Sequence, residues 1–439
     1  MKLPSLSLRY FYKLAANFVS ALINLFILFY IPKLLGPINY GIFTYLQQSF
    51  TQVVTFMDLS VSSAVFVKIS TNNKRLAFLK FISVYILLIF VILIIIGIFI
   101  SVFFLPQGIS ADGVTRNLIF LGIALAFSNY LLLNVSGILD AFGKTILLEK
   151  IRIFIRLFLF GGLIIFLYFE MINIYSFFVY QILTFAVIAL CAIALFLRNY
   201  EINIFRGVLR SKIIGQNIVN EIYDFSSPLV VHTLLGSIIV IFDLWLLKYV
   251  SGTAQVGFYG VSMAISQIPM FLISPLVPLI TREFASLNKS KLINNMRKIF
   301  ENYILPSFAL ILFIVFTGVA YSELTILFLG ELYITALAAI TIAMFYPYCQ
   351  TVSQLSVGIL ISVDETRTIR NITIYGAIFG IPLSLALLFY LELGALGLIL
   401  KILLVNIFVL SLQLFKVSLV IKKSFISIIK VQLKSLFSI

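Results

Sequence analysis

Residues 237–280 read SIIVIFDLWLLKYV, then SGTAQVG, then FYGVSMAISQIPMFLISPLVPLI: an apolar stretch, a hydrophilic turn and a second apolar stretch. A helix of roughly 20 apolar residues crosses about 30 Å of hydrocarbon. Asp243 lies inside the first stretch, where a carboxylate costs roughly 2.5–3.5 kcal/mol on insertion scales. The pattern predicts a membrane-crossing helical hairpin and makes Asp243 a candidate functional residue.

The same character extends along all 439 residues, of which 62% are hydrophobic and only 11% are charged. Soluble domains carry about 25% charged residues. We therefore predict an all-α polytopic membrane protein with about twelve transmembrane helices in two six-helix lobes. The expected spans are 14–32, 42–66, 81–105, 117–139, 151–169, 175–197, 225–248, 258–280, 301–320, 333–360, 371–391 and 395–418.

Basic residues gather in alternate connections between these spans. With a cytoplasmic N-terminus, every Lys and Arg falls on the inner side except Lys33, Arg116, Lys248 and Lys401. Inner loops of membrane proteins carry an excess of Lys and Arg. The net charge of +15 is therefore interpreted as membrane orientation and not as nucleic-acid binding, and both termini are expected in the cytoplasm.

The chain also has the pattern of a repeat. A hydrophilic stretch joins spans six and seven, so we expect an N-terminal lobe (1–197), a cytoplasmic linker (198–224), a C-terminal lobe (225–420) and a basic tail (421–439). The turns LLGPINYGIF (34–43) and VSGTAQVGFY (250–259) place Gly36 and Gly41 opposite Gly252 and Gly257 at a constant offset of 216. Two such halves fit a transporter whose substrate binds between repeats.

Polar residues form stripes inside the expected spans. In span two, five polar positions from Gln47 to Ser62 fall on one helical face, which we interpret as the wall of a polar cavity. The candidate cavity-lining residues are Asn17, Asn24, Gln47, Thr51, Thr55, Asp58, Gln350 and Gln354. The alternative is that these side chains bond neighbouring helices and hold the bundle together, which is the simpler interpretation for Ser, Thr and isolated Asn.

Ionisable residues within the spans give three further hypotheses. His232 and Asp243 stand eleven residues apart, almost three helical turns, and are candidate coupling or gating residues; a hydrogen-bonded core histidine and a salt bridge from Asp243 to Lys33 or Lys248 are the alternatives. Lys401 is within snorkelling reach of the outside. Arg152 and Arg156, one turn apart, are candidate phosphate contacts; positive-inside anchoring explains them equally well.

Motifs for catalysis are absent from the sequence. It holds no phosphate-binding glycine loop, and one histidine with two unclustered cysteines gives no metal-binding or Cys–His pattern. The remaining carboxylates are expected in loops and not in pairs. We therefore expect a protein that is not an enzyme and that uses no cofactor or metal.

Three stretches resemble a known family. They are KLLGPINYGIFTYLQQSF with TFMDLSVSSAVFVK, the Asp243 region through VGFYGVSMAI to PLIT, and LGELYITALAAI. In this order, within a twelve-span frame, they are similar to the Wzx-type O-antigen and polysaccharide-biosynthesis flippases of the multidrug/oligosaccharidyl-lipid/polysaccharide exporter superfamily. Asp58 and Asp243 match positions where members commonly carry acidic residues.

The resemblance implies a MATE-like fold in a bacterial cytoplasmic (inner) membrane. It implies a flippase that moves oligosaccharide units linked to undecaprenyl diphosphate to the periplasmic leaflet by alternating access. Membrane lipids would surround the protein, and a polysaccharide polymerase and a chain-length regulator would be its partners. Arg152, Arg156 and Lys401 would contact the diphosphate by position alone. A cation-coupled multidrug exporter of the same fold is the alternative. A polymerase or ligase is disfavoured because the expected external loops are short.

Overall fold

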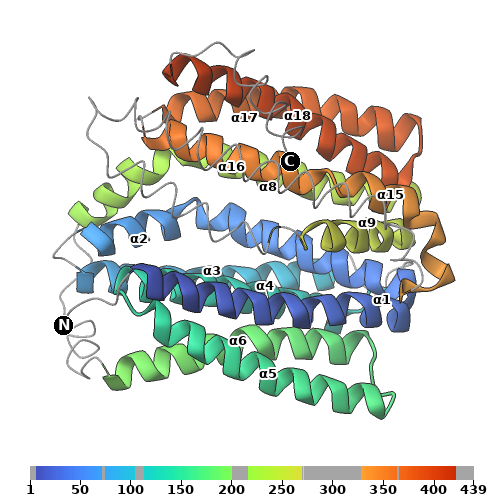
Figure 1. Cartoon of the computed structure of the whole chain (residues 1–439), viewed down its shortest axis with the longest axis horizontal. Helices are drawn as coiled ribbons and strands as arrows, with labels where there is room; N and C mark the ends of the chain where they lie inside the picture. Colours follow the sequence, from blue (N-terminus) through green and yellow to red (C-terminus); the bar gives the residue numbers. More distant parts are fainter. Residues whose placement is uncertain are drawn as a thin grey trace. The chain divides into compact units, whose positions relative to one another are not determined.

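The computed structural model describes residues 6–71, 75–103, 113–199, 216–268, 270, 328–362 and 365–421. These residues are all-helical, with twelve α-helices, so the predicted fold class is confirmed (Figure 1). The first six are α1 (Leu6–Asp58), α2 (Val61–Thr71), α3 (Arg75–Phe103), α4 (Arg116–Ala141), α5 (Thr145–Tyr168) and α6 (Ile174–Asn199). The others are α8 (Gln216–Ser251), α9 (Thr253–Ser266), α15 (Leu337–Ala343), α16 (Tyr346–Ser362), α17 (Thr366–Ser384) and α18 (Gly394–Ile421), with a 3-10 helix η2 (Glu331–Ala336) and a π-helical turn η3 (Leu385–Tyr390).

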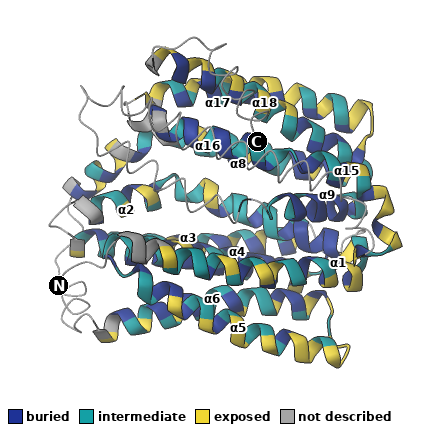
Figure 2. Ribbon diagram, in the orientation of Figure 1, coloured by how far each residue is buried: buried dark blue, intermediate teal, exposed yellow. Residues whose placement is uncertain are grey.

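Nine helical segments in this part of the chain are long and apolar enough to cross a membrane. Their outer faces expose large apolar side chains, as on α5, where Phe154 is 72% and Phe158 is 73% exposed (Figure 2). Apolar surface of this extent is stable in lipid and not in water. The chain is a multi-pass membrane protein. The expected span 301–320 and the end of span 258–280 lie outside the described residues.

The chain divides into two compact units. Unit 1 comprises Met1–Asn24 and Ile38–Leu244, and unit 2 comprises Leu25–Pro37 and Trp245–Ile439. The helices α1 and α8 therefore each contribute residues to both units. The lobe boundaries expected from the sequence stay a prediction.

In unit 1, α4 and α6 pack closely, and α1 adds aromatic contacts to α6. The ring of Phe43 lies 4.6 Å from that of Phe177 and 4.9 Å from that of Phe178. The first turns of α8 pack on α2 and α3, where Ile218 and Ile222 share a buried cluster with the apolar face of α2. The last part of the expected linker (198–224) is therefore helical and packs in the hydrophobic core of unit 1.

In unit 2, α18 packs against α9, α15, α16 and α17. The segment Leu25–Pro37 of α1 packs against the region around η2. The ring of Phe29 lies 4.9 Å from that of Phe328, and the fully buried Tyr333 donates a 3.0 Å hydrogen bond to the Pro32 carbonyl. A buried phenol needs such a partner. The contact fixes the C-terminal part of the expected first span to this unit.

Two expected spans are broken. Span 42–66 is interrupted because α1 ends at Asp58, and Leu59 and Ser60 take left-handed backbone conformations (φ 48° and 62°) before α2 begins. Span 333–360 consists of η2, α15 and α16. The expectation that the stripe from Gln47 to Ser62 follows one continuous helix is therefore wrong, since Ser62 belongs to α2.

The matched glycine turns have matching backbones. Gly36 has φ 72° and ψ 166°, and Gly252 has φ 85° and ψ 171°. Gly330, in the stretch FLGELY, has φ 86° and ψ 170° and is a third case that the sequence comparison of the two halves missed. This conformation is essentially restricted to glycine, so these three positions require Gly to end one helix and begin the next.

A second sequence match relates the hairpin formed by α5 and α6 to the hairpin formed by η3 and α18. Tyr168-Phe-Glu170 and Tyr390-Leu-Glu392 recur at an offset of 222, and both glutamates are left-handed, with φ of 55° and 50°. Residues other than Gly adopt this conformation uncommonly. The two halves thus share the geometry of a helix end as well as that of a turn, which supports a duplicated plan.

Candidate functional site

Charged residues gather in unit 1 where α1, α4 and α5 meet. Glu149 on α5 is only 1% exposed, and its Oε2 lies 3.0 Å from Arg152 Nη1, one turn further along the helix. Arg152 Nη2 also donates a 3.4 Å hydrogen bond to Ser136 Oγ on α4. A carboxylate buried to this degree is stable only with a charged partner. Arg152 supplies that charge.

A second ion pair lies beside the first. Lys13 Nζ of α1 donates a 3.1 Å hydrogen bond to Asp140 Oδ2 of α4, and these side chains remain 38% and 24% exposed. Lys13, Asp140, Arg152 and Arg156 all lie within electrostatic range of Glu149. We call these five residues the charge cluster. It holds three cations and two carboxylates, so its net charge is positive.

The cluster contains buried polar atoms that lack hydrogen bonds from the described residues. They are both Glu149 oxygens, Asp140 Oδ1 and Arg156 Nε. The Glu149–Arg152 contact is thus a close ion pair without hydrogen-bond geometry. Most buried polar atoms in proteins are hydrogen-bonded, so this cluster has spare binding capacity. Ionisable residues buried in membrane-crossing helices often mark substrate or ion pathways.

Asp58 forms a second polar site at the break between α1 and α2. Its carboxylate accepts a 2.7 Å hydrogen bond from the Tyr130 hydroxyl of α4, and further bonds from the hydroxyl and, at 3.4 Å, the backbone N–H of Ser62. The latter bond satisfies an orphan donor at the start of α2, as an N-terminal cap does. Asp58 is therefore held by three donors, and its predicted role as a cavity-lining residue stays a prediction.

The break itself is held by side chains on both sides. The Tyr85 hydroxyl donates a 2.6 Å hydrogen bond to the Met57 carbonyl, and the hydroxyls of Ser60 and Thr233 lie 2.8 Å apart. Two consecutive left-handed residues other than Gly cost about 1–3 kcal/mol each. Such strain persists only where surrounding contacts over-determine it, as these hydrogen bonds do.

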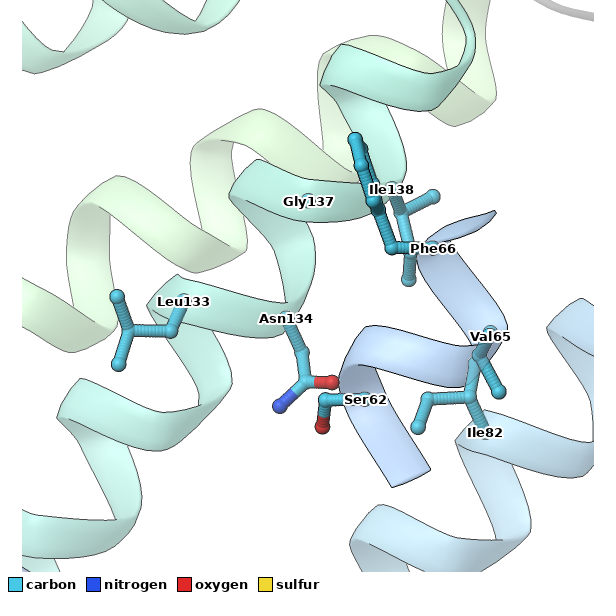
Figure 3. A pocket seen from close by; sticks show the side chains of 8 residues that line it. All are labelled: Ser62, Val65, Phe66, Ile82, Leu133, Asn134, Gly137 and Ile138. Atoms are coloured by element: carbon cyan, nitrogen blue, oxygen red, sulfur yellow. The ribbon is translucent and has the colours of Figure 1, made fainter. Parts of the chain in front are cut away.

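A small cavity adjoins this break. Figure 3 shows the Asn134 amide beside the Ser62 hydroxyl at its wall. Its lining residues are Ser62, Val65, Phe66, Ile82, Leu133, Asn134, Gly137 and Ile138. The volume is about 40 Å³, whereas one water needs roughly 10–15 Å³. The cavity has room for water and not for a sugar.

The rest of the span-two stripe serves its own helix. Thr51 Oγ1 donates to the Gln47 carbonyl at 2.7 Å, and Thr55 Oγ1 donates to the Thr51 carbonyl at 2.9 Å. Gln47 is half-buried. In span one, Asn17 is half-buried and Asn24 is exposed. Their predicted role as cavity-lining residues stays untested, and the two threonine hydroxyls bond to the backbone of α1.

Three of the candidate residues, Lys401, Gln350 and Gln354, lie in unit 2. Lys401 is 3% exposed and its Cε packs against Gly380 of α17, so the expected snorkelling to the outside is wrong. On α16, Gln350 and Gln354 are half-buried, and Gln350 Oε1 accepts no hydrogen bond from the described residues. A diphosphate role for Lys401 stays a prediction.

His232 and Asp243 lie on the continuous helix α8, as expected. Asp243 is 4% exposed, whereas His232 is exposed in unit 1. The pair therefore shares a helix but not an environment. Their predicted role in coupling or gating stays a prediction.

Sequence reasoning missed Glu149, Tyr130 and the pairing of Lys13 with Asp140. The expectation that the remaining carboxylates are unpaired residues of loops is wrong for Glu149. A signal for one pair was present, because Glu149-Lys-Ile-Arg152 has the i,i+3 spacing of a helical ion pair. Lys13 and Asp140 are 127 residues apart and give no local signal.

Comparisons with known proteins bear on the fold. The sequence matches no known family pattern and no curated protein. Among solved structures, the chain is similar to an inward-facing MATE multidrug transporter (14% identity, 92% of this chain and 99% of that chain, TM-score 0.65). It is equally similar to the lipid II flippase MurJ in an inward closed conformation (14%, 98% and 91%, 0.66).

The chain has the fold of MATE and MurJ. A third similar structure, a transporter of the MOP superfamily from Pyrococcus furiosus, is described as having a binding pocket of reverse polarity (16% identity, 95% of this chain and 96% of that chain, TM-score 0.56). These neighbours are transporters and a flippase and not enzymes, as the sequence predicts. They span nearly the full length of the chain, so the fold extends through both halves.

Proposed function

We propose that this protein is a flippase for oligosaccharide units linked to undecaprenyl diphosphate. It moves them from the cytoplasmic to the periplasmic leaflet of a bacterial inner membrane by alternating access, for an O-antigen or a similar surface polysaccharide. A polysaccharide polymerase and a chain-length regulator are the proposed partners downstream. The MurJ-like fold supports a lipid-linked cargo, and the charge cluster supports an anionic one.

The charge cluster is the observation that carries the proposal. Lys13, Arg152 and Arg156 place three cations against two carboxylates on membrane helices of unit 1. Guanidinium groups bind phosphate oxygens in a bidentate fork, and lysine binds them as a point charge. A diphosphate is the part of a lipid-linked sugar that needs such groups, because charge cannot enter hydrocarbon uncompensated.

The alternative cargo, an organic cation, needs carboxylates that are free to bind it. In unit 1 Asp58 accepts hydrogen bonds from Tyr130 and Ser62. Asp140 and Glu149 keep oxygens without hydrogen bonds from the described residues, but each is ion-paired with a cation, Lys13 or Arg152, and the cluster is net positive. This arrangement favours the anionic cargo. The lipid tail needs no site in the protein, since it remains in the bilayer while the headgroup crosses.

The two functions are separated by a transport assay in a cellular host. Deletion of the gene should abolish surface polysaccharide and leave lipid-linked units on the inner leaflet, where a lectin added to inverted vesicles binds them. Arg156→Ala should fail to restore export, while Lys416→Ala, which removes an exposed cation of α18, should restore it. Unchanged polysaccharide on deletion, with loss of ethidium efflux, would establish the multidrug exporter instead.

A further inference from the structure

We propose that Glu149 couples proton uptake to the binding of the anionic headgroup by exchanging its partner Arg152 for a proton. This inference rests on the proposed function and concerns the same charge cluster. In the empty site Glu149 is ionised and holds Arg152. When a phosphate oxygen takes the guanidinium, Glu149 accepts one proton from water, and it returns that proton when the anion leaves.

The first step of the argument is the isolation of Glu149. The side chain is 1% exposed, and neither of its oxygens accepts a hydrogen bond from the described residues. The ion pair with Arg152 at 3.0 Å is its close compensating contact. A buried carboxylate that loses its counter-charge and has no hydrogen bonds becomes neutral by binding a proton. Movement of Arg152 toward another anion removes that contact.

The second step is that Arg152 and its neighbours are able to reach an anion. Arg152 keeps 17% of its side chain exposed, and Lys13 keeps 38%. Arg156, one turn further along α5, has a buried Nε without a hydrogen-bond partner in the described part of the chain. Arg156 Nε is therefore a donor without a hydrogen bond in the described part of the chain. The Arg152 guanidinium contacts Glu149 and Ser136 there.

The third step is the charge balance. The groups around Glu149 are Lys13 from α1, Asp140 from α4 and Arg152 and Arg156 from its own helix, with Tyr180 of α6 beside Arg156. Cys191 of α6 borders the adjoining apolar core, and Lys144 and Lys150 lie within five residues of Glu149. A diphosphate diester brings two negative charges to a cluster whose net charge is +1. One proton on Glu149 restores neutrality.

The fourth step is that the fold does not need these charges. The hairpins that end at Glu170 and Glu392 correspond at an offset of 222, which places Asn371, Ile374 and Ile378 of α17 opposite Glu149, Arg152 and Arg156. At these three positions of α17 the second half carries no acid–base pair. The pair of Glu149 and Arg152 is therefore not repeated there, as expected for a site and not for a packing requirement.

The test is calorimetry on the full chain in nanodiscs, with farnesyl-diphospho-N-acetylglucosamine, a diphosphate diester, as the probe. Titrations near pH 7.5 in two buffers of different ionisation heat count the protons bound per ligand. We expect wild type to take up about one proton, so that its affinity falls about tenfold per unit rise in pH. The variant E149Q, which also corrects for protons bound by the ligand itself, should bind with about one proton fewer.

One variant serves as the control. E365Q removes an exposed carboxylate outside the cluster and should retain the uptake. Binding by wild type without proton uptake, or uptake that survives unchanged in E149Q, would overturn this inference and leave the flippase proposal intact. Absence of binding of the probe by wild type would overturn both. The proton count on wild type decides even where E149Q does not fold.

Discussion

The Tyr130 hydroxyl donates a 2.7 Å hydrogen bond to Asp58 Oδ1 from 72 residues away and joins α4 to the broken end of α1. Hydrogen bonds to charged groups contribute about 1.5–3 kcal/mol. We expect Tyr130→Phe to lower the free energy of unfolding by about this amount, measured by thermal or denaturant unfolding in detergent. Tyr175→Phe, which removes an exposed hydroxyl 3.1 Å from that of Thr115, is the matched control and should change little. Equal stability of the two variants would show that Asp58 does not depend on Tyr130.

Replacement of the glycine in either turn by any other residue should destabilise the protein. A Cβ at Gly36 or Gly252 meets no atom within 4 Å, so backbone conformation alone disfavours it. We expect Gly36→Ala and Gly252→Ala each to destabilise the protein by about 1–3 kcal/mol. Gly161→Ala, in the middle of α5 with equally open surroundings, should stabilise by about 0.5–1 kcal/mol. A neutral result at both turns would contradict the strained backbone.

Packing between α1 and α4 requires a small residue at position 122. A Cβ there would lie 2.9 Å from Phe50 Cδ2 and 3.1 Å from Leu46 Cβ, and the latter atom cannot move without its helix. Overpacking of this kind costs about 1–3 kcal/mol. Gly122→Ala should therefore lower the unfolding midpoint, whereas Gly137→Ala on the same helix, whose nearest atom is 3.8 Å away, should raise it slightly. Equal unfolding midpoints for the two variants would contradict this prediction.

The orientation predicted from Lys and Arg is open to chemical labelling. After Cys191 and Cys349 are replaced by Ala, Glu170→Cys between α5 and α6 should react with an impermeant maleimide added outside cells. Lys144→Cys between α4 and α5 should react only after permeabilisation, because basic loops stay in the cytoplasm. The reverse pattern would place both termini outside.

Composition and turn chemistry were sufficient to predict the helical fold and the first two glycine turns. Only glycine adopts φ near 80° with ψ near 170° at low cost, so Gly36 and Gly252 leave a trace in the sequence. Gly330 is required by the same backbone conformation, but its turn was not predicted because no glycine lies 216 residues before it. The break at Leu59 and Ser60 leaves none, because neither residue favours a left-handed backbone.

The site was predictable only in part. Arg152 and Arg156 were found by their one-turn spacing, and Glu149 has a similar spacing to Arg152 that predicts their pairing. The bonds from Lys13 to Asp140 and from Tyr130 to Asp58 depend on how distant helices pack. Stripes of polar residues therefore indicate which helices carry polar side chains, but the partner of each is decided by tertiary structure.

The glycine turns recur in both halves of the chain, whereas the ion pair of Glu149 and Arg152 has no counterpart at the corresponding positions of α17. This difference indicates how a duplicated chain diverges. After a duplication, a connection such as that at Gly36 and Gly252 tolerates few replacements, because backbone geometry admits almost no other residue. Side chains on a helix face tolerate many, so one copy is able to acquire ionisable groups while the other stays apolar. The two halves then share an ancestry without sharing a task. A chimera that carries the first half twice would inherit two copies of the ion pairs and no apolar counterpart.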